Sequence, residues 1–122
     1  MITSFRDVDI KRILVRCDGA PKIGLGHIVR CLALADELRN YYGFIIEFAI
    51  LKGQEGVAQI QEKGYSVHQP LAKSFNELDE GDWLNCLVSD LNAHALVLDV
   101  RTDLEIEAIH RLKNNGVLVV AI

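Results

Sequence analysis

The sequence predicts an α/β fold in which a mostly parallel, Rossmann-like sheet is flanked by helices. Apolar bursts alternate with amphipathic stretches along the chain, which is typical of repeated βα units. The bursts are continuously apolar, as expected for strands that are covered on both faces. A length of 122 residues, half of them hydrophobic, suits one domain with its own core. We expect this domain over residues 10–122, after a lead-in at 1–9.

The first strand is expected over residues 13–17, where an apolar run ends at Asp18-Gly19. The next helix is expected over 27–40, because its apolar residues recur at helical spacing on one face. The apolar run 44–51 then predicts a second strand, and the amphipathic stretch 53–63 predicts a second helix.

The remaining elements continue the same alternation. A short third strand is expected over 66–69, and a helix over 74–89 with a break near Gly81, since glycine weakens a helix interior. The last elements are a strand at 95–100, a helix at 104–114 and a strand at 117–122. Because Ile122 falls within an apolar strand, we expect a longer polypeptide, of which this is the front part.

Composition and charge favour some classes of protein over others. A net charge of −4 with scattered basic residues argues against a sequence-independent nucleic-acid surface. No apolar run is long enough for a bilayer and the start lacks a signal-peptide core, so we expect a cytoplasmic protein without membrane contact. The three cysteines have no metal-type spacing, and Cys17 and Cys31 are expected to be small buried hydrophobes. No metal and no cofactor are predicted.

The turn Gly24-Leu25-Gly26-His27 joins the first strand to the first helix. Free N–H groups at such a helix start favour a phosphate. The turn lacks the third glycine of a dinucleotide fingerprint, where Val29 stands, and no P-loop lysine follows, so NAD and ATP are less favoured. The helix start favours a neutral His27 suited to general-base chemistry, whereas a nearby carboxylate such as Asp18 would oppose this. Alternatively, His27 only hydrogen-bonds a loop carbonyl.

The string RCDGAPKIGLGHIVRCLALA, from Arg16 to Ala35, resembles the opening of the pseudaminic-acid pathway UDP-sugar hydrolases and of the related spore-coat polysaccharide biosynthesis proteins. The resemblance implies the N-terminal half of a GT-B-type pair of Rossmann-like domains, with a second domain that this chain lacks. It implies metal-free attack of water at the anomeric carbon of a nucleotide-sugar, with release of UDP. His27 would be the catalytic base, and Gly24 and Gly26 would line the phosphates or the sugar.

Further candidates lie at strand ends and on the first helix. Asp99 ends a predicted parallel strand on the ligand side of the sheet, and Asp18 has the same position or braces the glycine turn. Arg30 either reaches a phosphate or pairs with an acid on the helix. Arg101 stands where the family often has a tyrosine, so that tyrosine's role is not carried over.

Two other functions fit the same residues. One is sugar transfer to an acceptor, and the other is a nucleotide-sugar-binding module without catalysis. The sequence does not determine which sugar is bound or the oligomeric state. No role in the site is expected for the other histidines, which are His68, His94 and His110.

Overall fold

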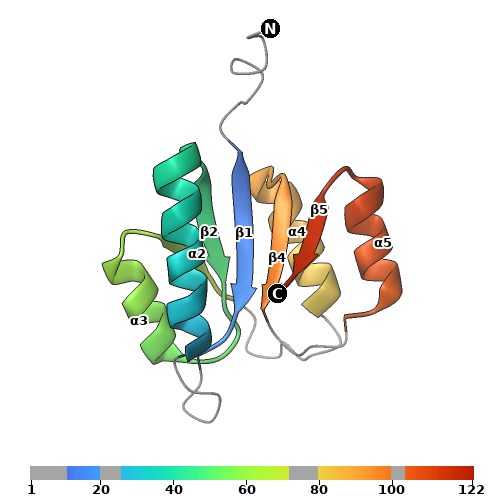
Figure 1. Ribbon diagram of the computed structural model, residues 1–122. Helices are drawn as coiled ribbons and strands as arrows, with labels where there is room; N and C mark the ends of the chain where they lie inside the picture. The colour runs from blue at the N-terminus through green and yellow to red at the C-terminus, as the bar shows by residue number, and fades with distance from the viewer. Residues whose placement is uncertain (1–10, 20–25, 72–79, 100–103) are drawn as a thin grey trace, which may run out of the picture.

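The computed structural model describes residues 11–19, 26–71, 80–99 and 104–122 (Figure 1). These ranges form an α/β fold with a parallel sheet flanked by helices, as the sequence predicts. The strands are β1 (Arg12–Cys17), β2 (Ile45–Ala49), β3 (Ser66–His68), β4 (Ala95–Asp99) and β5 (Leu118–Ala121). The helices are α2 (Gly26–Tyr42), α3 (Gln54–Glu62), α4 (Glu80–Leu91) and α5 (Ile106–Asn114). The lead-in at 1–9 lies outside the described residues.

The strands run in the order β3-β2-β1-β4-β5, with β1 at the centre. Each neighbouring pair is parallel, and β1 pairs with both β2 and β4. Helices α2 and α3 pack on one face of the sheet, and α4 and α5 on the other (Figure 1). The chain therefore continues from β1 to α2 on one face of the sheet, and from β4 to α5 on the opposite face. This reversal between β1 and β4 is the place where open α/β sheets bind ligands, at the carboxyl ends of the strands.

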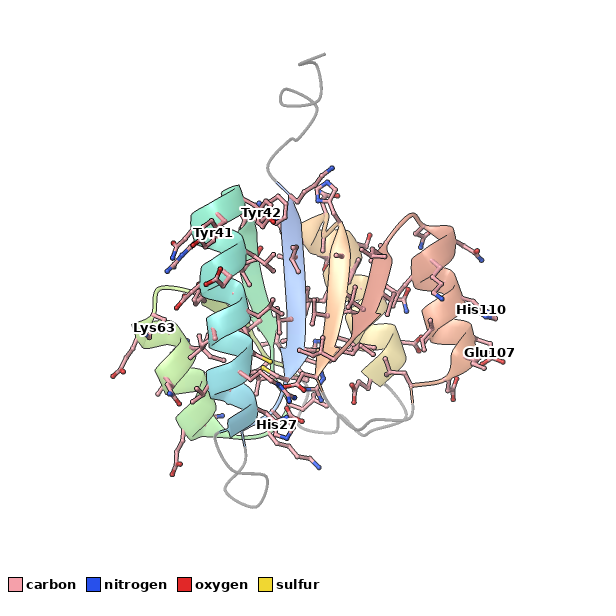
Figure 2. The ribbon with its side chains drawn as sticks, in the orientation of Figure 1. His27, Tyr41, Tyr42, Lys63, Glu107 and His110 are labelled. Atoms are coloured by element: carbon pink, nitrogen blue, oxygen red, sulfur yellow. The ribbon has the colours of Figure 1, made fainter. Side chains whose placement is uncertain are left out.

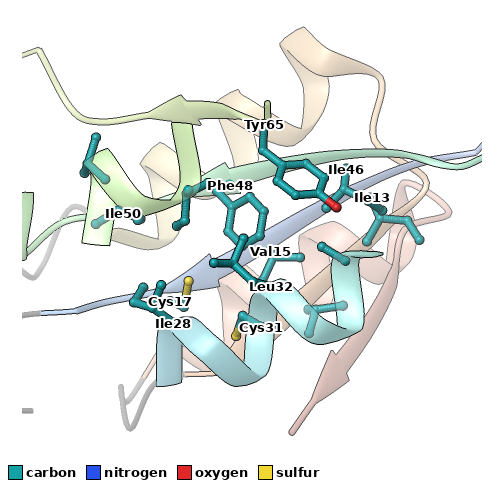
Figure 3. Packing of buried hydrophobic residues seen from close by; sticks show 14 residues of the cluster. Ile13, Val15, Cys17, Ile28, Cys31, Leu32, Ile46, Phe48, Ile50 and Tyr65 are labelled. Carbon is teal, nitrogen blue, oxygen red and sulfur yellow. The ribbon is translucent and has the colours of Figure 1, made fainter. Parts of the chain in front are cut away.

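Alternation along β1 divides the core into two clusters. Ile13, Val15 and Cys17 contribute to the cluster under α2 and α3, whereas Leu14 contributes to the cluster under α4 and α5. In the first cluster, Phe48 is fully buried and meets the ring of Tyr65 edge-on at 5.4 Å between centroids (Figure 3). Both faces of the sheet are thus covered along β1, most of whose residues are buried and apolar, whereas most residues of the edge strand β5 are exposed.

Gly81 is the second residue of α4, and the residues before Glu80, on which the predicted break depends, lie outside the described part of the chain, so that break stays a prediction. A Cβ at Gly81 would lie 2.7 Å from the Cβ of Ala108, which belongs to α5. The glycine therefore allows two helices to approach closely. Residues 74–79 of the predicted helix lie outside the described part of the chain.

A second close contact joins the end of β1 to two helices. A Cβ at Gly19 would lie 2.6 Å from Cγ1 of Ile28 on α2 and 3.4 Å from Cα of Gly56 on α3. A Cβ at Gly56 would meet the same Ile28 side chain at 3.1 Å. The Ile28 side chain thus packs over two bare backbones, and this contact holds the beginning of α2 against the sheet.

No helix in the described ranges is long and apolar enough to cross a membrane.

Tyr65 makes the stability of the fold sensitive to alkaline pH. Burial and the hydrogen bond that its hydroxyl donates to Asp36 (2.5 Å) raise the pKa of Tyr65 from 10.0 to about 12. Unfolded chains lose this proton near pH 10 while folded chains keep it, so stability falls as pH rises between these values. Between pH 9 and pH 11, the free energy of unfolding should therefore fall by about 1 kcal/mol less in Tyr65→Phe than in the parent. Urea unfolding of both proteins at the two pH values measures this difference. The control Tyr41→Phe, at a side chain that is 76% exposed, should follow the parent.

Candidate functional site

The carboxyl ends of β1 and β4 lie side by side, because Cys17 is the register partner of Asp99. Helix α2 begins at this same edge, and Figure 2 shows His27 in its first turn. The predicted residues His27, Arg30 and Asp99 are therefore brought together at the reversal point of the sheet. Gly26 is the first residue of α2, whereas Gly24 and Arg101 lie outside the described residues.

The Asp99 carboxylate is the centre of this cluster, with only 2% of its side chain exposed. Its Oδ2 accepts a hydrogen bond from the Cys31 thiol (3.1 Å) and lies 3.2 Å from Nδ1 of His27. Its Oδ1 accepts a hydrogen bond from Nη2 of Arg30. The partners His27, Arg30 and Cys31 are three and four residues apart, so they share one face of α2. A buried charge with this many donors is well compensated.

His27 and Arg30 form the solvent side of the cluster, with 39% and 56% of their side chains exposed. Nη2 of Arg30 lies 3.2 Å from Nδ1 of His27, in addition to its bond to Asp99. The site thus presents a guanidinium and an imidazole to solvent, on a buried carboxylate that holds both. This arrangement suits recognition of an anion, because charge-assisted hydrogen bonds from arginine are strong and directional.

Asp18 takes part in a different network. Its Oδ1 accepts hydrogen bonds from the backbone N–H groups of Leu51 (2.9 Å) and Lys52 (3.1 Å), and its two oxygens bind the Arg16 guanidinium. These contacts brace the segment after β2, whereas residues 20–25 of the glycine turn lie outside the described residues, so both the bracing of that turn and the substrate-binding role of Asp18 stay predictions. The carboxylate within hydrogen-bond distance of His27 is Asp99, and an effect of Asp18 on His27 stays a prediction.

Arg16 is only 2% exposed and lies between two carboxylates. Its Nε donates to Glu80 at the start of α4 (3.0 Å), and its Nη1 donates to Asp18 (2.7 Å). Burial alone would lower the pKa of Arg16, but the two carboxylates outweigh it and raise that pKa. The guanidinium therefore stays charged, and it connects β1, α4 and the segment after β2. Trp83 packs against the apolar cluster of this face, with its ring centroid 6.0 Å from the guanidinium carbon.

Cys31 is the residue of the site that the sequence interpretation missed. It belongs to the buried cluster as predicted, but its thiol also binds Asp99. The signal in the sequence is its spacing of four residues from His27, which places both side chains on one face of α2. That spacing indicates a site only once the strand bearing Asp99 is known to lie beside α2.

The environment of Cys31 predicts low reactivity. The hydrogen bond with Cys17, burial and the Asp99 carboxylate all raise the pKa of the Cys31 thiol. Because the thiolate is the nucleophile, iodoacetamide should alkylate the exposed Cys86 much faster than Cys17 or Cys31 in the folded protein. Mass spectrometry of a time course checks this, and equal rates at the three positions would contradict it.

The other histidines lie away from the cluster. Nε2 of His68 is 2.7 Å from Oε1 of Glu47, and Nδ1 of His94 accepts a hydrogen bond from the backbone N–H of Arg12 (3.1 Å). Within the described ranges, no three His, Cys, Asp or Glu side chains are placed to hold a metal ion.

Comparisons with known proteins show the fold. The structure of a universal stress protein from Archaeoglobus fulgidus has a TM-score of 0.54 at 16% identity, over 98% of both chains. An uncharacterized protein from Methanocaldococcus jannaschii is 34% identical over 56 residues, which are 46% of this chain and 12% of that protein. The chain thus matches a small part of this relative. No family model matches the chain.

These findings correct the functional interpretation. The fold is similar to that of a universal stress protein, and none of the comparisons identifies a UDP-sugar hydrolase or a spore-coat polysaccharide protein. Membership of that family, the hydrolase reaction and the related alternatives of sugar transfer and nucleotide-sugar binding are therefore wrong predictions. The resemblance depends on the local string from Arg16 to Ala35, and likeness over a short segment does not determine function. The catalytic role of His27 came with it and stays an untested prediction, and so does the second, GT-B-type domain.

Proposed function

We propose that this chain is a nucleotide-binding domain whose ligand places its phosphate beside Arg30 and His27. The observation that carries the proposal is the Arg30–His27 pair, exposed at the reversal point of the sheet and anchored on the buried Asp99. The solved structure with this fold is named for a stress response, but the proposal depends on the site and not on that name.

Two features favour a nucleotide over other anions. The strand order β3-β2-β1-β4-β5 agrees with the first five strands of the fold that binds nucleotides at its reversal point. Helix α2 begins at the site without an acidic residue in its first turn, so its free N–H groups add positive potential for a phosphate.

The remaining assignments belong to the same proposal. The ligand is a small phosphorylated molecule, without nucleic acid or membrane as a partner, and the protein is cytoplasmic. Support comes from the net charge of −4 and from cysteines that are free in the described residues.

An amide NMR titration tests the proposal directly. Adding ADP or UDP should give saturable shifts at Gly26, His27 and Arg30, with smaller shifts for inorganic phosphate at equal concentration. Phe44, at the other end of α2, should not move. A folded spectrum without saturable shifts at these three amides would contradict nucleotide binding at this edge.

A further inference from the structure

Nδ1 of His27 lies between a hydrogen-bond acceptor and a hydrogen-bond donor, which require opposite protonation of this nitrogen. Oδ2 of Asp99, at 3.2 Å, can only accept a hydrogen bond, and Nη2 of Arg30, at 3.2 Å, can only donate one. A neutral imidazole carries its proton on one of its two nitrogens, so Nδ1 can satisfy one of these neighbours but not both. The tautomer of His27 therefore depends on which neighbour dominates.

We propose that Arg30 sets the tautomer of His27, and that an anionic ligand reverses it by taking the Arg30 guanidinium. The ligand step depends on the proposed function. In the free site, Nη2 lies within hydrogen-bond distance of both Oδ1 of Asp99 and Nδ1 of His27, and donating one hydrogen to each keeps the imidazole proton on Nε2. Asp99 meanwhile accepts from Arg30 and from the Cys31 thiol, so it does not need the imidazole as a donor.

Binding of a phosphate changes this balance. Guanidinium pairs readily with phosphate oxygens, so Arg30 turns toward the ligand and Nδ1 loses its donor. Oδ2 of Asp99 then favours the proton on Nδ1. Water takes the proton from Nε2 and another water supplies one to Nδ1, so the charge of the imidazole is unchanged. Nε2 becomes an acceptor, which suits a hydroxyl of the ligand better than a second phosphate oxygen.

The side chains of the cluster differ in how readily they can move when a ligand binds. Asp99 is buried and held by the thiol of Cys31, so it stays in place. The Arg30 side chain is 56% exposed, and its only hydrogen-bond partners among the described residues are Asp99 and His27. Arg30 is therefore the member of the cluster that a ligand can draw away, and it acts as a positioning residue for the imidazole.

Long-range proton–nitrogen NMR of the His27 ring tests the inference, on the alkaline plateau where the ring is neutral. The free parent should carry its proton mainly on Nε2. Arg30→Met should carry it mainly on Nδ1 with no ligand present, and Arg39→Met, a change nine residues further along α2, should match the parent. Saturating ADP should shift the parent toward Nδ1–H.

Two results would overturn the inference. If the parent and Arg30→Met share one tautomer, Arg30 does not set it, whether or not a nucleotide binds. If ADP shifts the amides of the site but leaves the ring of the parent unchanged, the ligand step is wrong although the proposed function stands. If the tautomer of His27 changes in Arg30→Met but ADP shifts no amides of the site in the parent, the proposed function and the ligand step are wrong. The control of the tautomer by Arg30 is then still supported.

Discussion

Asp18→Ala is expected to lower the free energy of unfolding by about 3–5 kcal/mol, because it leaves a buried guanidinium without one of its two carboxylates. Arg16 is 2% exposed, and Asp18 binds it through both oxygens. The same change removes the acceptor for the backbone N–H groups of Leu51 and Lys52. A loss of this size is a large part of the roughly 5–15 kcal/mol that stabilises an ordinary domain. Urea unfolding at neutral pH measures it.

The matched control is Asp82→Ala, which removes the carboxylate of an exposed pair with Arg111. Here 69% of the aspartate side chain and 53% of the arginine side chain are exposed, and such pairs contribute about 0–1 kcal/mol. Similar losses in the free energy of unfolding of the two variants would show that the network around Arg16 stabilises the fold no more than a surface ion pair does.

Arg30→Met is expected to weaken binding of ADP or UDP by about 10-fold to 100-fold, since a hydrogen bond to a charged group contributes about 1.5–3 kcal/mol. Methionine keeps much of the length and apolar volume of the arginine stem but cannot bind a phosphate. Because the Arg30 side chain is 56% exposed, the fold should tolerate the change. Isothermal titration calorimetry on both proteins at one salt concentration measures the effect.

Arg39→Met provides the comparison at the other end of the same helix. Arg39 carries the same charge, but its guanidinium lies 4.5 Å from the ring centroid of Tyr65 and far from the carboxyl edge of the sheet. Its loss should change affinity less than about twofold, as expected for a change in general charge alone. Equal weakening in the two variants would contradict a local role for Arg30.

Much of the fold is predictable because its signals are local. Apolar runs identify the five strands to within two residues or so at each end, and Gly43, Gly64 and Gly116 all take the positive φ expected just after a helix. The close packing at Gly81 could not be predicted from the sequence, because its reason is tertiary. The sequence around it shows a weak helix position, whereas the contact that requires it comes from Ala108, on another helix.

The individual residues of the candidate site could be predicted from the sequence, but the contacts between them could not. His27, Arg30 and Asp99 were each expected near a ligand, from their place at a helix start or a strand end. That they share hydrogen bonds depends on the pairing of β1 with β4, which places Asp99 beside α2. The prediction of the reaction is wrong because it depends on the resemblance of the segment from Arg16 to Ala35, and likeness over a short segment does not determine chemistry.

The contact of Ile28 with Gly19 and Gly56 also constrains how this sequence can evolve. A methyl group at Gly19 would lie 2.6 Å from the Ile28 side chain, which would have to shift, and one at Gly56 would lie 3.1 Å from it, which is tighter than ordinary contact. A smaller residue at position 28 would relieve this, so the three positions are expected to covary. Among natural variants, an alanine at 19 or 56 should therefore occur together with a valine or alanine at 28. This pattern would identify true relatives of the chain even where the glycine turn has changed.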